Sequence, residues 1–237
     1  VVVAAAAGAG VGILLEVLAF RPLRFAAGGE VGGSIEMPSF VASFAALFIL
    51  QAIAQNWTGS QLINVPIGIF SDRLMFFGDF YVRKVLLITF VLAVVLLVLA
   101  WLIVNRTQVG RAVRAIAMDD EAAGMLGINA NLLKLATMAI SSALAGVAGA
   151  LLVVSLGAVD YTTGGAQLLR GFAVIILGGV GSIAGSLVGG LLLGIAEGLT
   201  IYWFGSQWQA AAAFVLLIGF LLVRPQGIFG KPQVDRA

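Results

Sequence analysis

The sequence predicts an all-α membrane protein whose chain crosses the bilayer about seven times. Of its 237 residues, 61% are hydrophobic and 10% are charged, whereas about a quarter of the residues in soluble domains carry a charge. The charges lie in clusters, and the stretches between them include Val85–Val104, with 20 uncharged residues, and Leu135–Val159, with 25. Because about 20 apolar residues in a helix cross the roughly 30 Å hydrocarbon core, this pattern indicates a polytopic membrane protein.

Four complete spans are predicted in the first two thirds of the chain. Each is an apolar stretch bounded by charged or polar residues: Val1–Leu18, Ser39–Asn56, Val85–Val104 and Leu135–Ser155. The chain opens on Val1 without an initiating methionine, and no basic leader precedes Val1–Leu15, which is unlike a signal peptide. We therefore expect a natural start upstream, with one further span and eight crossings in the full-length protein.

Three further crossings are predicted in the last third, where Glu197 is the only charge between residues 171 and 223. They are a short half-span at Gly171–Leu177 that breaks at the glycines of Gly178–Ser182, a full span at Ala184–Phe204, and, after a turn at Gly205–Gln207, a last span at Trp208–Val223. Irregular backbone at membrane depth is tolerated only where protein or a water-filled cavity surrounds it. We therefore expect the glycine cluster to face protein or a pathway rather than lipid.

Basic residues predict the orientation of this topology. With the short segment counted as a crossing, residues 19–38, 105–134 and 224–237 share one face. That face holds Arg21, Arg24, Arg106, Arg111, Arg114, Lys134, Arg224, Lys231 and Arg236, against Arg73, Arg83, Lys84 and Arg170 on the other. Since Lys and Arg concentrate on the cytoplasmic side, we expect the chain to begin outside and to end in the cytoplasm. If the short segment turned back instead, the counts would be six against seven and the bias would vanish.

Composition excludes several kinds of chemistry. The chain has no histidine and no cysteine, so it lacks the ligands of zinc and iron–sulfur sites and the residues of Cys or Ser-His nucleophile systems. Lys231 follows Gly230, but Pro225 and Pro232 prevent a phosphate-binding loop of the G-x-x-x-x-G-K-[ST] type. We therefore expect no cofactor and no enzymatic site here; if ATP hydrolysis drives this protein, another chain supplies it.

The loop at residues 105–134 carries the most informative pattern. Its first half predicts an amphipathic helix, with Arg111 and Arg114 on one face and Val113, Ile116 and Ala117 on an apolar one. On this pattern alone, a helix lying on the lipid headgroups, with its arginines toward anionic lipid, is an equally good interpretation.

A second, short helix is predicted directly after the first. Asp119 or Asp120 can cap its N-terminus, and Glu121 lies favourably at the positive end of the helix dipole. Gly127 can end the helix as a residue in the left-handed conformation. The product is about two turns of helix, with a pair of alanines near its start, held between two spans.

Four segments, in the same order along nearly the whole chain, resemble the permeases of branched-chain amino acid importers. They are EVLAFRPLR (Glu16–Arg24), GRAVRAIAMDDEAAGMLGIN (Gly110–Asn129), LGGVGSIAGSLVGGLLLG (Leu177–Gly194) and RPQGIFG (Arg224–Gly230). Within the second, Glu121-Ala122-Ala123-x-x-x-Gly127 matches the E-A-A-x-x-x-G signature in the cytoplasmic loop of permease subunits of ATP-binding-cassette importers. The chain departs from the family in two respects: no proline follows Gly127, and the family's extra N-terminal span is missing.

The resemblance implies a single transmembrane permease domain over residues 1–237, with a coupling loop at 105–134 and a cytoplasmic tail at 224–237. It implies an importer in the cytoplasmic (inner) membrane of a bacterium or archaeon. The implied partners are a second permease subunit, expected to be a distinct relative, two ATPase subunits that use ATP and magnesium, and a periplasmic or extracellular substrate-binding protein; no nucleic acid is implied.

The same resemblance implies which residues couple to the ATPase and what the importer carries. The coupling residues are Asp119, Asp120, Glu121, Ala122, Ala123 and Gly127. The implied substrates are branched-chain amino acids. Urea or short-chain amide permeases of the same broad family are the alternative, and a secondary transporter or a channel is a further one.

Glycines in the last third of the chain recur at spacings that suit helix packing. Gly181, Gly185 and Gly189 recur every four residues, as do Gly190, Gly194 and Gly198, and ridges of small residues permit close helix contact. An unwound segment at membrane depth also frees backbone groups that could contact a substrate. Gly178, Gly179 and Gly181 are therefore candidates for the translocation path or for a hinge.

Two carboxylates lie in or near predicted spans. Glu197 is an intramembrane ionisable group and so a candidate for the translocation path, with a partner expected; Arg170 and Tyr202 are near it in sequence. Because Glu197 lies about seven residues from the outer end of its span, the favoured interpretation is that it reaches interfacial water. Glu16, beside Arg21 near a cytoplasmic end, is expected to snorkel or to pair there.

The predicted outer segment Trp57–Arg83 is rich in aromatic residues. It contains Phe70, Met75, Phe76, Phe77 and Phe80. An aromatic belt at the membrane interface is the favoured interpretation, and a docking surface for a soluble binding protein is the alternative.

Overall fold

The structure is a computed structural model that describes residues 1–23, 36–64, 74–77, 80–118, 120–179, 181–224 and 226–230. For residues 36–37, 74–77, 80–82 and 120–121 it describes the backbone alone. The chain forms two compact units, Val1–Tyr161 (unit 1) and Thr162–Ala237 (unit 2). A single permease domain over residues 1–237 remains a prediction.

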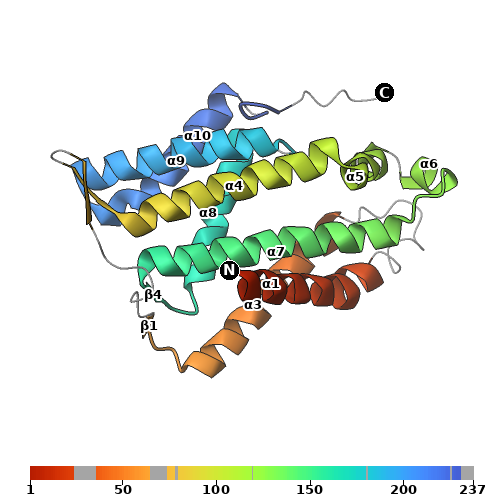
Figure 1. The fold of residues 1–237 in the computed structure, drawn as a ribbon, viewed down its shortest axis with the longest axis horizontal. Coiled ribbons are helices and arrows are strands. Elements are labelled where there is room, and N and C mark those ends of the chain that lie inside the picture. Colours follow the sequence, from red (N-terminus) through yellow and green to blue (C-terminus); the bar gives the residue numbers. More distant parts are fainter. Residues whose placement is uncertain are drawn as a thin grey trace. The chain divides into compact units, whose positions relative to one another are not determined.

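Helices make up most of both units (Figure 1). Unit 1 contains α1 (Val2–Leu15), the π-helical turn η1 (Glu16–Phe20), α3 (Glu36–Thr58), α4 (Lys84–Arg106), α5 (Gln108–Met118), α6 (Asp120–Met125) and α7 (Ala130–Leu156). Unit 2 contains α8 (Thr163–Gly178), α9 (Ile183–Phe204), the 3₁₀ turn η3 (Ser206–Trp208) and α10 (Gln209–Val223).

Six helical stretches in the described part of the chain are long and apolar enough to cross a membrane. They are Val2–Leu23, Pro38–Thr58, Lys84–Arg106, Ala130–Leu156, Ile183–Phe204 and Ser206–Val223, and α8 is a shorter apolar helix. These stretches match the six full spans and the short seventh segment of the prediction. The chain is therefore an all-α polytopic membrane protein, as expected.

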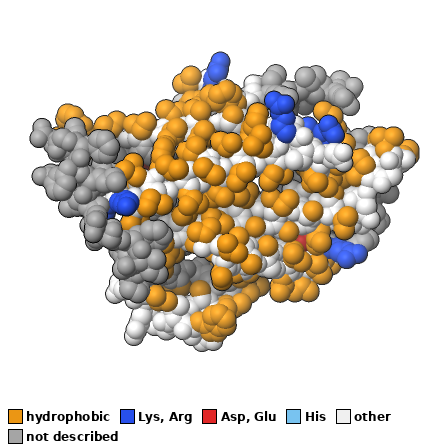
Figure 2. Space-filling view, viewed as in Figure 1, with side chains coloured by type: hydrophobic (Ala, Val, Ile, Leu, Met, Phe, Trp, Pro, Cys, Tyr) orange, Lys and Arg blue, Asp and Glu red, His pale blue; other side chains and the backbone are white. Residues whose placement is uncertain are grey.

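The apolar side chains of these helices cover the outside of the protein. In the most apolar part of α4 no residue is buried, and in α10 Ala213 is the one described residue that is buried. Figure 2 shows hydrophobic side chains over most of one face and few charged ones. A helix of a soluble protein hides its apolar stripe against a core, so these helices are built to contact lipid or other membrane subunits.

The short α8 starts earlier than predicted. The sequence placed its beginning at Gly171, directly after the charge of Arg170, whereas the helix begins at Thr163. The prediction was wrong because Arg170 interrupts the apolar pattern without interrupting the helix; its charge is paired with Glu197 across unit 2. At about 1.5 Å per residue, the 16 residues of α8 rise about 24 Å.

The segments that connect the helices of unit 1 meet at opposite ends of the helices. Strand β1 (Ile63–Asn64) pairs antiparallel with β4 (Ala158–Val159), which joins the segment after α3 to the segment after α7. At the other end, Arg21 and the first residues of α7 line one cavity. The predicted topology requires the ends of α3 and α7 on one side of the membrane, and Arg21 and the start of α7 on the other, and unit 1 has this arrangement. Which side is cytoplasmic remains a prediction.

The aromatic segment after β1 forms a hairpin. Strand β2 (Leu74–Phe77) pairs antiparallel with β3 (Phe80–Arg83), and Phe77 lies opposite Phe80. The side chains of Met75, Phe76, Phe77 and Phe80 are not described, and Phe70 and Arg73 lie outside the described residues. The choice between an aromatic belt and a docking surface therefore remains open.

Helices α1 and α7 lie side by side (Figure 1) because small residues let their backbones approach closely. A Cβ atom placed on Gly8 would collide with the carbonyl oxygen of Ser142, and one on Gly12 with the side chain of Ser142. On α7, a Cβ atom on Gly146 would collide with the carbonyl oxygen of Ala4. These residues form small-xxx-small ridges on both helices, which the sequence analysis did not single out.

Unit 2 has its own apolar core. It consists of Ala173, Leu177, Leu193 and Ala213, with Val174, Leu216, Leu217 and Phe220 packed against them. Gly185 on α9 touches the backbone of Gly178 on α8, and Gly189 faces the carbonyl oxygen of Val174. The packing interpretation is therefore confirmed for Gly185 and Gly189.

The remaining predicted ridge glycines make no close contact within the described chain. Gly181 lies outside the helix, with a φ of 84° and open space around it. The nearest atom to a Cβ on Gly190 would be Val174 Cγ1 at 3.9 Å, and Cβ atoms on Gly194 and Gly198 would meet nothing described within 4 Å. The second ridge thus does not hold this chain together, as far as the structure describes it.

Candidate functional site

The predicted short helix is present as α6, at one end of unit 1 beyond the ends of α4 and α7 (Figure 1). Gly127 has a φ of 83°, and the N–H of Ile128 donates to the carbonyl oxygen of Ala123 at 3.2 Å. This arrangement satisfies a carbonyl group at the helix end, so the predicted left-handed termination at Gly127 is confirmed. Asp119 and the side chains of Asp120 and Glu121 lie outside the described part, and the identity of the N-cap stays open.

The two alanines of the signature face in different directions. Ala123 is buried, at 3% exposure, whereas Ala122 is exposed. The exposed surface around α6 is apolar instead at Met118, Met125 and Leu126, with 89%, 87% and 81% exposure. These three residues were not predicted from the sequence, because scattered apolar residues in a loop have no periodicity. We call Met118, Met125 and Leu126 the α6 patch.

Helix α5 is fastened to the end of α4. The hydroxyl of Thr107 donates to the carbonyl oxygen of Ile103 at 2.5 Å and accepts from the N–H of Gly110 at 3.2 Å. The guanidinium of Arg114 donates to the carbonyl oxygen of Val104, so a cation caps the C-terminal end of α4. At least one guanidinium nitrogen of Arg114 is thus bonded to the protein backbone. The contacts between α4 and α5 form a joint that connects α6, which follows α5, to a membrane span.

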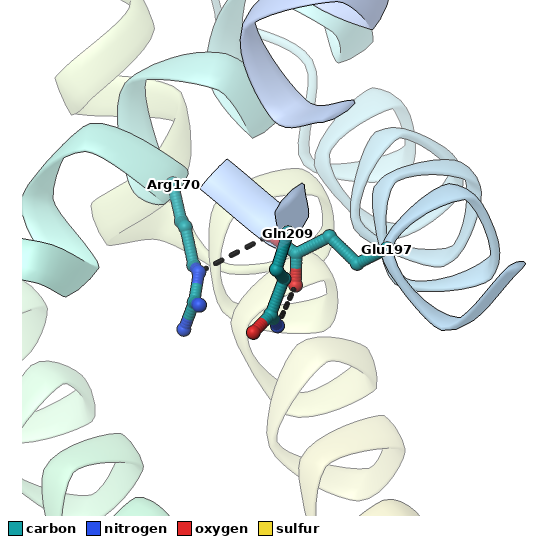
Figure 3. Close-up of polar contacts among 3 residues, drawn as sticks. All are labelled: Arg170, Glu197 and Gln209. Atoms are coloured by element: carbon teal, nitrogen blue, oxygen red, sulfur yellow. Dashed lines mark hydrogen bonds and ion pairs between the residues drawn. The ribbon is translucent and has the colours of Figure 1, made fainter. Parts of the chain in front are cut away.

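Glu197 lies in a polar cluster inside unit 2 (Figure 3). Its Oε1 is 3.1 Å from Nε of Arg170 on α8, and its Oε2 accepts a hydrogen bond of 2.8 Å from the side-chain amide of Gln209 on α10. The side chain of Glu197 is 12% exposed and that of Arg170 is 34% exposed. The cluster therefore ties the three helices of unit 2 together through one carboxylate.

The expected partner of Glu197 is confirmed as Arg170, but the interpretation that Glu197 reaches interfacial water was wrong. Its Oε1 is buried and accepts no hydrogen bond from any described residue, although it is ion-paired. Tyr202 is 83% exposed and lies edge-on to Trp203. Gln209 was not predicted as a partner of Glu197. The signal that could have identified it is its position as a polar residue at the start of the last span.

The glycine break is enclosed by the C-terminal segment. Helix α8 ends at Gly178, and Gly179 has a φ of 94°. The N–H groups of Ile228 and Phe229 donate to the carbonyl oxygens of Leu177 and Gly178, at 3.0 and 3.1 Å. Both carbonyls at the end of α8 are thus bonded within the chain, and Leu177, Gly178 and Gly179 are buried.

Part of the predicted cytoplasmic tail is therefore an element of unit 2. Residues 226–230 pack on the break, where a Cβ on Gly179 would come within 2.5 Å of the backbone nitrogen of Gly230. The sequence could not reveal this contact, because it joins backbone atoms of two distant segments. Residues 231–237, with Lys231 and Arg236, lie outside the described part.

Comparison with known proteins gives consistent relatives. Residues 1–224 match the family model described as branched-chain amino acid transport system / permease component. The chain is 34% identical over 227 residues to the high-affinity branched-chain amino acid transport system permease protein BraD of Pseudomonas aeruginosa, covering 95% of this chain and 72% of the relative. It is 32% identical over 225 residues to the corresponding protein LivH of Escherichia coli K12, covering 94% and 70%.

A more distant relative has a different substrate in its name. The chain is 27% identical over 235 residues to the ribose import permease protein RbsC of Escherichia coli K12, covering 94% of this chain and 72% of the relative. No solved structure matches the chain. The match over residues 1–224, together with identities above 30% to two named permeases, shows that the chain belongs to the permease-component family of branched-chain amino acid transport systems.

Proposed function

We propose that this chain is a permease subunit of an ATP-driven importer that moves branched-chain amino acids across the cytoplasmic membrane of a bacterium or archaeon. The chain itself hydrolyses no ATP; two ATPase subunits do so. A second permease subunit, a distinct relative, and a soluble substrate-binding protein complete the importer. Family membership and the names of BraD and LivH support this proposal.

The observation that carries the proposal is the α6 patch. Met118 at the end of α5, Met125 at the end of α6 and Leu126 directly after it are almost fully exposed. Helix α6 lies beyond the ends of α4 and α7 (Figure 1). We take these exposed apolar groups, which lie outside the predicted spans, as a contact site for a partner. An ATPase cleft that accepts α6 would cover the patch, and Ala122 would allow its wall to approach the helix backbone.

The mechanism follows from the joint between α5 and α4. When ATP closes the ATPase dimer, the docked α6 moves with it, and the capping of Val104 by Arg114 transmits this motion to α4. Such motion favours the state in which the path opens to the other side of the membrane. We assign Gly178, Gly179 and Gly181 to a hinge rather than to substrate contact, because the carbonyls next to the break are bonded to Ile228 and Phe229.

Glu197 receives a related role in this proposal. Its carboxylate on α9 contacts Arg170 on α8 and Gln209 on α10, so it would limit how far α8 and α9 move apart about the hinge between them. Asp119, Asp120, Glu121, Ala122, Ala123 and Gly127 form the segment that docks, in which Ala123 and Gly127 shape α6 while the exposed residues meet the ATPase.

The test is co-purification and uptake with the α6 patch altered. The double variant Met125→Ser/Leu126→Ser should insert normally, lose the ATPase on purification and lose leucine uptake. The matched control is Leu62→Ser, because Leu62 is also an exposed apolar residue, at 68%, outside the loop at 105–134. Full ATPase binding and coupled uptake in the double variant would contradict the docking role.

A separate measurement tests the substrate. Proteoliposomes with the whole importer should accumulate labelled leucine and should not accumulate labelled ribose. Transport of ribose without leucine would place the chain with the RbsC-like permeases instead.

A further inference from the structure

A cavity of about 340 Å³ opens in unit 1 beside the amphipathic helix α5. It is lined by Glu16, Val113, Ile116, Ala117, Leu133, Lys134, Thr137, Met138 and Ser141. Its volume lies at the lower end of the range for small-molecule sites, about 300–1,000 Å³. Three elements of the fold form its wall, namely η1, α5 and α7.

The lining combines three kinds of chemistry. Glu16 supplies a carboxylate and Lys134 an ammonium group, Thr137 and Ser141 supply hydroxyls, and the remaining side chains are apolar. The hydroxyl of Thr137 donates to the carbonyl oxygen of Leu133 at 2.8 Å, which leaves its oxygen able to accept a hydrogen bond. A zwitterion with an aliphatic side chain requires this combination of one anion, one cation and an apolar wall.

Glu16 occupies an unusual position in the helix. It is 5% exposed, which contradicts snorkelling to water but not the alternative expectation that it pairs within the protein. It opens the π-helical turn Glu16–Phe20. Its N–H is shared between the carbonyl oxygens of Gly12 and Ile13. Single π-helical turns are rare and occur frequently at functional sites, and an ionisable group within a membrane helix is a functional candidate.

Both charged groups also interact within the protein. Glu16 and Lys134 each take part in further polar or electrostatic contacts, and Glu16 borders a second cavity that Arg21 lines. A ligand would therefore join or exchange with these contacts. Replacing a contact within the protein by an ion pair with the ligand keeps the buried carboxylate compensated, as burial of a charge requires.

We propose that this cavity binds a zwitterionic aliphatic amino acid on the cytoplasmic side of the importer, with the ligand's ammonium group at Glu16 and its carboxylate at Lys134. The choice of ligand rests on the proposed function, and the side rests on the positive-inside orientation. Because α5 forms one wall and is fastened to α4 and followed by α6, an occupied cavity restrains the coupling helix. Amino acid that accumulates in the cytoplasm would thereby slow further import.

The test uses proteoliposomes that contain the whole importer with its ATPase facing the lumen. External leucine is held constant, internal leucine is varied, and uptake of labelled leucine is measured. In the wild type, internal leucine should slow uptake. Glu16→Gln and Lys134→Met should each raise the internal leucine concentration needed for half-inhibition by about tenfold or more, because each removes one charge-assisted contact.

Controls separate this proposal from a structural effect. Lys84→Met removes an exposed lysine far along the sequence from the cavity and should leave the inhibition unchanged. Ala117→Phe fills the cavity from α5 without altering a buried charge. Whatever its basal rate, its uptake should no longer depend on internal leucine, even where Glu16→Gln inserts poorly. Internal ribose should have no effect on any variant.

The outcomes distinguish the two proposals. If the wild type does not import leucine, the proposed function fails. If the wild type imports leucine but internal leucine does not slow it, or slows it equally in Glu16→Gln, Lys134→Met and Ala117→Phe, the cavity proposal fails and the proposed function stands.

Discussion

The N–H of Ile228 donates a hydrogen bond of 3.0 Å to the carbonyl oxygen of Leu177, the one described residue with a large side chain that is fully buried. With the neighbouring bond from Phe229 to Gly178, it closes the end of α8 with backbone groups from the far end of the chain. Helix ends leave carbonyl groups without helical partners, and in a membrane each unsatisfied group is costly. The C-terminal segment thus completes a helix that the local sequence cannot complete.

Replacing Gly179 by alanine should destabilise unit 2. The residue has a φ of 94°, and an added Cβ would press on the backbone of Gly230, so we expect a loss of about 1–3 kcal/mol in unfolding free energy. Gly190→Ala is the matched control, since the nearest described atom to its Cβ would be Val174 Cγ1 at 3.9 Å. Thermal unfolding in detergent measures both; equal melting temperatures would show that the contact does not stabilise the protein.

Arg170 and Glu197 should show strong energetic coupling. Glu197→Leu leaves the partly buried Arg170 without its ion pair, and we expect it to cost about 1–3 kcal/mol. The double variant Arg170→Leu/Glu197→Leu should cost less than the sum of the two single variants, because no unpaired charge remains. A double-mutant cycle on unfolding free energies in detergent checks this expectation, and strict additivity would argue against the pair.

The crossing of α1 and α7 should depend on Gly12 and not on Gly10. A Cβ on Gly12 would collide with the side chain of Ser142, whereas one on Gly10 would meet nothing described within 4 Å. Gly12→Ala should therefore cost about 1–3 kcal/mol through overpacking, and Gly10→Ala should cost little or slightly stabilise α1. Paired thermal melts decide the question, and a larger loss for Gly10→Ala would contradict this packing.

Gly127→Pro should uncouple ATP hydrolysis from uptake. Proline fixes φ near −65°, whereas Gly127 has a φ of 83°, so α6 would lose its termination and its direction. Gly127→Asn is the matched variant, since asparagine tolerates the left-handed conformation at helix ends. Leucine uptake per ATP hydrolysed should fall in the proline variant and remain near normal in the asparagine variant; normal coupling in both would exclude a role for this turn.

Much of this protein is fixed by local sequence. The length of each apolar stretch decided the spans, because the bilayer sets the number of residues that a crossing helix needs. The left-handed end of α6 was also predictable, since Gly127 is the residue type that such a turn favours. The order of four family-like segments predicted the permease family that residues 1–224 match.

Other features were decided only in three dimensions. The start of α8 was misplaced because the charge of Arg170 is compensated by Glu197, a residue from another helix. The burial of Ala123 and the exposure of Met125 depend on how α6 sits against its neighbours, and the bonds from Ile228 and Phe229 join segments far apart in the chain. Hydropathy describes the free energy of transferring each residue from water to an apolar phase. These contacts depend instead on which distant residues meet, and only the tertiary structure determines which residues meet.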